Sequence, residues 1–153
     1  MPADPRLRLR ALLGLIAYGA FVAAVGLWPA PVDRPFDPLL SRVLRAVGRT
    51  GVRPLDAYNV LEFTANVAFF VLPAVLLVLI VGRGRWWLAP LTGLLCSVGI
   101  ELAQHFFLPG RLGSVNDVIA NTVGALIGAG IGVQALRRRR GRHRADSRVP
   151  RSS

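Results

Sequence analysis

Four apolar stretches separated by short polar segments form the main pattern of the chain. They cover residues 11–28, 60–81, 86–108 and 115–136. An α-helix needs about 20 mostly apolar residues to cross the hydrocarbon core of a bilayer, with a lower limit near 17. All four stretches exceed that limit, so the pattern predicts an all-α integral membrane protein with a bundle of four transmembrane helices.

The first apolar stretch, residues 11–28, has a second interpretation as a secretory signal peptide. Signal peptides usually have an apolar region of about 7 to 15 residues followed by a cleavage site of small residues. Here the apolar run is longer, and it ends in Trp28-Pro29-Ala30-Pro31, which is a poor cleavage site. We therefore expect a membrane span.

Between the first two spans, apolar and basic residues recur with the period of a helix. Asp37-Pro38 is a typical helix start, and Gly51 is a typical stop. One face would carry apolar side chains and the opposite face three arginines, namely Leu39, Leu40, Val43, Leu44 and Val47 against Arg42, Arg45 and Arg49. This pattern predicts a short amphipathic helix on the outer membrane surface.

The composition agrees with a membrane protein. Of the 153 residues 53% are hydrophobic, and the mean hydropathy is +0.48. The net charge of +11 arises from 19 arginines, since the chain has no lysine. These arginines flank the apolar stretches, so we expect them to contact anionic lipid head groups and expect no nucleic-acid partner. The single Cys96 excludes a disulfide within the chain and a cysteine metal cluster.

The distribution of arginines predicts the orientation in the membrane. With the N-terminus in the cytoplasm, 13 arginines lie on the cytoplasmic side and six on the other, which is the bias described by the positive-inside rule. The chain then divides into a basic cytoplasmic N-terminus (1–10), a four-helix transmembrane domain (11–136) and a basic cytoplasmic tail (137–153). The composition of the tail predicts disorder.

Polar side chains interrupt the last three spans near their outer ends. They recur at intervals of three or four residues and so share one side of each helix: Glu62 and Asn66; Glu101, Gln104 and His105; Asp117 and Asn121. At 1.5 Å per residue, Asn66, Glu101 and Asn121 are predicted at the same depth, about 10 Å below the outer interface. A carboxylate in a span costs on the order of 3 kcal/mol on insertion scales. We therefore expect these side chains to face one another and to form a candidate ligand-binding site.

Each of these residues also has a purely structural interpretation. Glu101 is either a functional carboxylate or one that only holds helices together. Asp117 with Ser114 matches a capping box at the start of the fourth span. Arg111 either joins that helix N-terminus in holding an anion or neutralises a carboxylate. Glu101, His105 and Asp117 include only one histidine, so we predict neither a metal ion nor another cofactor.

Small residues recur at every fourth position of the fourth span. They are Ala120, Gly124, Gly128 and Gly132. Such a stripe lets two helix backbones approach each other closely, so it predicts tight packing of this span against a neighbouring helix and requires no ligand.

The same residues resemble the pattern of a known family. The pattern combines Glu62, Asn66 and Pro73 with Glu101-x-x-Gln104, Arg111 and Asp117-x-x-x-Asn121-x-x-Gly124-x-x-x-Gly128. Over about residues 57–134 it resembles the VanZ-like family of small bacterial membrane proteins, which is named after a teicoplanin-resistance protein. The resemblance implies a multi-pass helical protein of the bacterial cytoplasmic membrane, in a family of which most members have no assigned biochemical activity.

The sequence leaves three functions open. The first is an accessory or binding protein that holds the head group of an envelope lipid or a lipid-linked cell-wall precursor, with the link to teicoplanin resistance that the resemblance implies. The second is an intramembrane hydrolase or transferase in which Glu101 acts as general acid or base beside His105, although no nucleophile is evident. The third is a purely structural membrane protein. Membrane lipids are the expected partners, and assembly into a homo-oligomer is compatible with the sequence.

Overall fold

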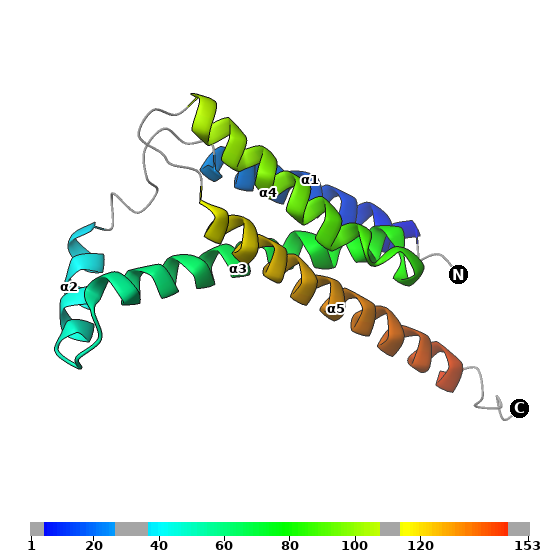
Figure 1. Cartoon of the computed structure of the whole chain (residues 1–153). Coiled ribbons are helices and arrows are strands. Elements are labelled where there is room, and N and C mark those ends of the chain that lie inside the picture. The colour runs from blue at the N-terminus through cyan, green and yellow to red at the C-terminus, as the bar shows by residue number, and fades with distance from the viewer. Residues whose placement is uncertain (1–4, 27–36, 108–113, 147–153) are drawn as a thin grey trace, which may run out of the picture.

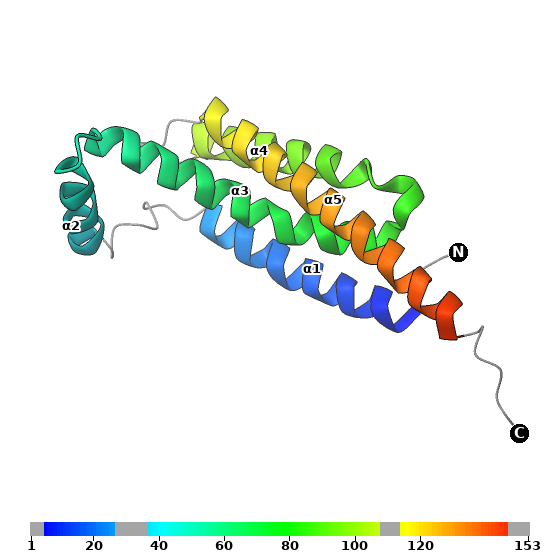
Figure 2. The same ribbon diagram turned by 90° about the horizontal axis from the view of Figure 1, so that it is seen from below.

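The chain folds into helices connected by short segments, as seen in a computed structural model that describes residues 5–26, 37–107 and 114–146. The elements are α1 (Pro5–Gly26), α2 (Asp37–Gly48), α3 (Pro54–Val81), the 3-10 turn η2 (Arg83–Arg85), α4 (Leu88–Phe107) and α5 (Val115–Asp146). Figures 1 and 2 show α1, α3, α4 and α5 in one bundle, with α2 apart from it at the beginning of α3. The prediction of an all-α fold is confirmed for these residues.

Three helices are long and apolar enough to cross a membrane. They are Pro5–Ala24 within α1, the whole of α3, and Val115–Arg138 within α5. α4 has 20 residues, which corresponds to about 30 Å of helix. It is not one of the three candidates, because Glu101, Gln104 and His105 lower the hydropathy of its second half. The fold is thus that of a helical membrane protein with three candidate spans, and the fourth span stays a prediction.

Three helices extend further than the apolar pattern predicts. α1 begins at Pro5, six residues before the predicted start and within the segment predicted as a basic N-terminus (1–10). α3 begins at Pro54, six residues before the predicted start, because proline at the first helical position already has a helical φ and needs no N–H partner. α5 continues to Asp146, so the tail predicted to be disordered from residue 137 is helical over residues 137–146. Arginine is a good helix former, and extending an existing helix costs little. Residues 147–153 lie outside the described part of the chain, as do residues 28–31.

α3 and α5 make the most extensive contact in the bundle. A Cβ atom added to Gly124 would meet the carbonyl oxygen of Val67, and one added to Gly128 would meet that of Val71. Backbone oxygens cannot move away as the end of a flexible side chain can. The close packing predicted from the small-residue stripe is therefore confirmed, and α5 requires glycine at these two positions.

Mostly small side chains form the main cluster of the buried hydrophobic core, namely Ala74, Val78, Ala89, Ala125 and Ala129. These residues belong to α3, α4 and α5, so the core joins the three helices whose polar residues the sequence singles out. α1 packs mainly on α3, where the rings of Phe21 and Phe69 lie 6.2 Å apart, and has little contact with α4. The bundle is consequently tight around α5 and open between α1 and α4.

The short helix α2 has the amphipathic character that the sequence predicts. Arg42 and Arg45 are exposed, whereas Leu40, Leu44 and Val47 are half-buried. Val43, also predicted on the apolar face, is exposed. After α2 the chain turns at Gly51, which has a φ of 90°, a left-handed conformation that glycine adopts readily. This turn brings α2 against the beginning of α3 (Figure 1).

Candidate functional site

Polar side chains from three helices meet at the end of the bundle where α4 ends and α5 begins. Asn66 of α3 donates from Nδ2 to Oδ1 of Asp117 on α5, at 2.8 Å. Asn121 of α5 donates from Nδ2 to Oγ of Ser97 on α4, also at 2.8 Å. We call these residues, together with two others on the same face of α4, the polar cluster: Asn66, Ser97, Glu101, Gln104, Asp117 and Asn121.

Glu101 on α4 caps the N-terminus of the neighbouring helix α5 by accepting a backbone hydrogen bond. The first N–H groups of a helix have no partner within it, and the helix dipole favours a negative charge near them. The backbone N–H of Ser114, just before α5, donates to Oε2 of Glu101 at 2.7 Å. In a capping box, the side chain of the residue three positions later, Asp117, would accept from this N–H group. In this structure Glu101 accepts from the N–H of Ser114, and Asp117 accepts from Asn66 of α3.

The inner part of the polar cluster is almost completely buried. The exposed fraction is 0% for Ser97, 6% for Asn121 and 9% for Gln104. Oδ1 of Asn121 has no hydrogen-bond partner within the part of the chain that the structure describes. Leaving a buried acceptor unsatisfied costs on the order of 1–3 kcal/mol. This atom therefore needs a donor from another source, such as water or a ligand.

The contacts between α4 and α5 differ by about one turn from those that counting along the sequence predicts. Equal depth would place Glu101 beside Asn121, whereas Asn121 contacts Ser97, four residues before Glu101. Glu101 instead reaches the beginning of α5. The predicted depths were counted from the ends of the apolar stretches, and the end of a helix shifts by one or two residues with the criterion that defines it. Hydropathy alone therefore cannot fix the register of neighbouring helices.

Three of the predicted site residues are not members of the polar cluster defined above. Glu62 is exposed on α3, one turn before Asn66. His105 is exposed at the end of α4, with its ring centroid 5.2 Å from that of Phe106. Arg111 lies outside the described residues. Within residues 5–26, 37–107 and 114–146, no group of three His, Cys, Asp or Glu side chains could hold a metal ion.

Ser97 belongs to the cluster but not to the site predicted from the sequence. A hydroxyl costs little in a transmembrane helix, because it can bond to its own helix backbone or across a helix interface, so it attracts less attention than a carboxylate. Its spacing did contain the signal: Ser97 precedes Glu101 by four residues and Gln104 by seven. These intervals place the three side chains on one face of α4.

The fold and the polar cluster define a helical membrane protein with a polar site among α3, α4 and α5. The family model for VanZ/LLP1 matches residues 15–136, from α1 into α5. The chain belongs to the VanZ/LLP1 family, which confirms the resemblance and extends it to the first helix. No curated protein and no solved structure matches the chain.

Proposed function

We propose that the protein is a binding or accessory protein of the bacterial cytoplasmic membrane that holds a polar head group at the polar cluster. The head group belongs to an envelope lipid or a lipid-linked cell-wall precursor. In this proposal α4 is the fourth span, both termini are cytoplasmic and the polar cluster lies at the outer leaflet. The length of α4 and the distribution of arginines support this arrangement.

The observation that carries the proposal is the buried Oδ1 of Asn121, which has no partner among residues 5–26, 37–107 and 114–146. If the cluster only held helices together, each of its buried polar atoms would be expected to find a partner within the protein. Instead, Oδ1 of Asn121 has no donor among the described residues, although Nδ2 of the same side chain donates to Ser97 of the neighbouring helix. A ligand hydroxyl or N–H group would supply the donor that this atom lacks.

The chemistry of the cluster favours a head group with several donors. The carboxylates of Glu101 and Asp117 and the carbonyl oxygen of Asn121 are all acceptors, and ionised acceptors form the stronger hydrogen bonds. Hydroxyl or ammonium groups match them. Arg111, three residues before Ser114 in the sequence, would pair with the phosphate. Because Glu101 already occupies an N–H group at the start of α5, we assign the phosphate to the arginine.

An intramembrane hydrolase or transferase fits these contacts less well. A serine nucleophile needs a general base within hydrogen-bond distance. Ser97 is fully buried and accepts from the amide of Asn121, which cannot act as a base. His105 is exposed beside Phe106. These positions favour binding as the function of the cluster.

The test is the susceptibility of bacteria to teicoplanin and vancomycin, with the variants at matched membrane levels. Glu101→Gln removes the charge but leaves an oxygen that can accept from Ser114, and Arg111→Ala removes the phosphate partner. Asp56→Asn and Arg53→Ala are matched controls, because these two residues form an exposed ion pair at the beginning of α3, outside the cluster.

We expect resistance conferred by the wild type to be lost in both cluster variants and kept in both controls. Resistance that persists in Glu101→Gln and Arg111→Ala would overturn the role of the cluster. If the wild type itself gives no shift, the link to glycopeptides is removed, and the lipids that co-purify with the protein would have to identify the head group.

A further inference from the structure

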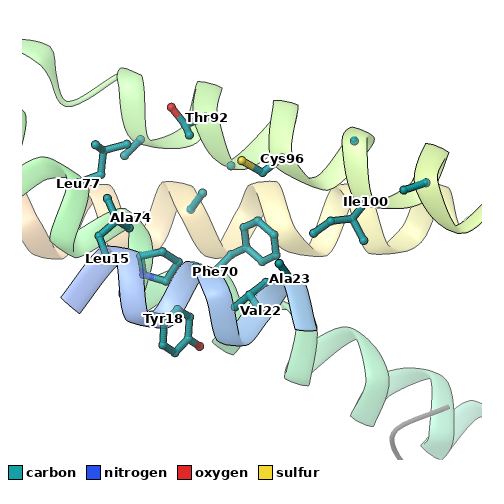
Figure 3. A pocket seen from close by; sticks show the side chains of 17 residues that line it. Leu15, Tyr18, Val22, Ala23, Phe70, Ala74, Leu77, Thr92, Cys96 and Ile100 are labelled. Carbon is teal, nitrogen blue, oxygen red and sulfur yellow. The ribbon is translucent and has the colours of Figure 1, made fainter. Parts of the chain in front are cut away.

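An apolar groove lies between α1 and α4, with α3 along its floor. Its volume is about 540 Å³, within the range of roughly 300–1,000 Å³ that is usual for ligand pockets. Figure 3 shows Tyr18 and Val22 of α1 on one side, Cys96 and Ile100 of α4 on the other, and Phe70 of α3 between them. The groove is separate from the polar contacts described above.

The groove is open because of how α1 packs and because two wall residues are glycines. α1 lies on α3 and has little contact with α4. Gly19 of α1 and Gly99 of α4 both line the groove, and a Cβ atom added to either would meet nothing within 4 Å. Unlike Gly124 and Gly128, these glycines leave space that no atom of the described residues fills.

The position and length of the groove indicate what fills it. One wall, α1, and the floor, α3, are two of the candidate membrane spans, so lipid hydrocarbon is the surrounding medium. Along α4 the groove extends from Ala89 to Ala103, which at 1.5 Å per residue is about 21 Å. One leaflet supplies half of a hydrocarbon core of about 30 Å, or about 15 Å per acyl chain. The groove is therefore long enough for one fatty acyl chain.

One end of the groove adjoins the polar cluster. Ile100 and Ala103 line the groove, and Glu101 and Gln104 are the next residues along α4. α4 thus presents an apolar stripe and a polar stripe on adjacent faces. On α3, the groove residue Phe70 follows Asn66 by one turn. An amphipathic molecule with its chain in the groove would have its polar end beside the polar cluster.

We propose that the groove holds one fatty acyl chain of a membrane glycerolipid whose head group lies at the polar cluster. The position of the head group rests on the proposed function, whereas binding of the chain depends on the groove alone. The site would select a lipid by two criteria at once: donors on the head group, and a chain that fits between α1 and α4.

The test is photo-crosslinking of the purified full chain to phosphatidylglycerol that carries a diazirine on one acyl chain. Gly99→Leu and Gly19→Leu each place a side chain in the groove. Gly130→Leu is the matched control, because Gly130 is exposed on α5, does not line the groove and has no neighbour within 4 Å of an added Cβ. A leucine side chain at either groove position would occupy space that the acyl chain fills in the wild type.

Cys96 gives a second measurement without altering the groove. It is the only cysteine of the chain, and it is exposed and lines the groove. An acyl chain beside it would slow its reaction with a maleimide. We expect phosphatidylglycerol to lower the labelling rate of the wild-type protein in detergent, and an unchanged rate would count against the bound chain.

The proposal is supported if crosslinking is lost in Gly99→Leu and Gly19→Leu and persists in Gly130→Leu. Crosslinking that persists in both groove variants overturns it, as does stronger crosslinking to a polyprenyl phosphate with the same diazirine. Glu101→Gln separates the two proposals. If crosslinking is lost only in the groove variants, the acyl-chain site stands, but the head group does not bind at the polar cluster. If crosslinking is lost only in Glu101→Gln, the acyl chain does not bind in the groove.

Discussion

At the scale of single residues, Glu101 is informative because one of its oxygens meets a backbone N–H group of the next helix. A backbone N–H group can donate to any suitably placed oxygen. Glu101→Gln therefore keeps an acceptor for Ser114 and changes mainly the charge, whereas Glu101→Ala removes both the acceptor and the charge. The pair of substitutions separates what the bond contributes to the fold from what the charge contributes to binding.

We predict that Glu101→Ala lowers the free energy of unfolding by about 1 kcal/mol more than Glu101→Gln does, as expected for loss of an N-terminal helix cap. Unfolding by sodium dodecyl sulfate in mixed micelles would measure the difference. Equal losses in the two variants would show that the bond to Ser114 contributes nothing to stability.

The bond between Asn121 and Ser97 gives a second prediction. Interhelical hydrogen bonds in membranes contribute about 0.6 kcal/mol on average and at most about 1.7. A double-mutant cycle of Ser97→Ala and Asn121→Ala should give a coupling energy in this range. Ser41→Ala, at a half-buried position of α2, is the control, because this hydroxyl donates to the carbonyl oxygen of Pro38 in its own helix. It should give no coupling with Asn121→Ala. If the effects of Ser97→Ala and Asn121→Ala on the free energy of unfolding are additive, the hydrogen bond between Asn121 and Ser97 does not contribute to stability.

At this scale the sequence predicts which helix faces are polar but not which side chains bond. Glu101, Asp117 and Asn121 were identified because polar groups are costly in a span, and the structure brings their helices together at one end. The partner of Asn121 could not be predicted, because it depends on how far α4 slides along α5. That register is set by packing, for example of Ala125 against Gly93, where an added Cβ would lie 2.6 Å away.

At the scale of elements, the contact between α3 and α5 depends on glycine at its closest points. We predict that Gly128→Leu destabilises the protein by at least about 1–3 kcal/mol, the usual cost of overpacking, because the new side chain meets the backbone of Val71 and the Cβ of Ala74. Gly130→Leu, two residues later on the open side of α5, should be tolerated.

The amount of each variant in the membrane and its resistance to unfolding by detergent would test this prediction. If Gly128→Leu and Gly130→Leu behave alike, the close approach of α3 and α5 is not required for the fold.

The order and type of the helices could be predicted from the sequence because long apolar periods and proline or glycine boundaries are strong local signals. The full extent of α5 could not. Its last residues are polar and basic, which is typical of a solvated tail, yet they continue a helix that packing has already nucleated. The early start of α3 has a similar origin, since Pro54 begins the helix before its apolar part is reached.

At the scale of the whole molecule, the main prediction is that α4 crosses the membrane, although Glu101, Gln104 and His105 lower its hydropathy and it is not one of the three candidate spans. If it does, Gly84 in the turn before α4 and Val115 at the start of α5 lie on opposite sides. In a Cys96→Ser background, an impermeant maleimide should label Val115→Cys in intact cells and Gly84→Cys only after permeabilisation.

Ser41→Cys on α2 is the control for this labelling experiment and should react from the same side as Val115→Cys. Labelling of Gly84→Cys and Val115→Cys from one side would mean that α4 does not cross, and the bundle would then have the three spans that length and hydropathy alone support. The sequence could not decide this point, because the same polar residues that mark the cluster weaken the hydropathy of α4.

The bond from Ser114 to Glu101 also bears on how the protein is made. The acceptor precedes the donor by thirteen residues, so the ribosome synthesises α4, with its carboxylate, before the first turn of α5. When α5 emerges, the group that closes its N-terminus is already present on the preceding helix. We therefore expect α4 and α5 to leave the insertion machinery as a pair, with each helix shielding the polar groups of the other from lipid.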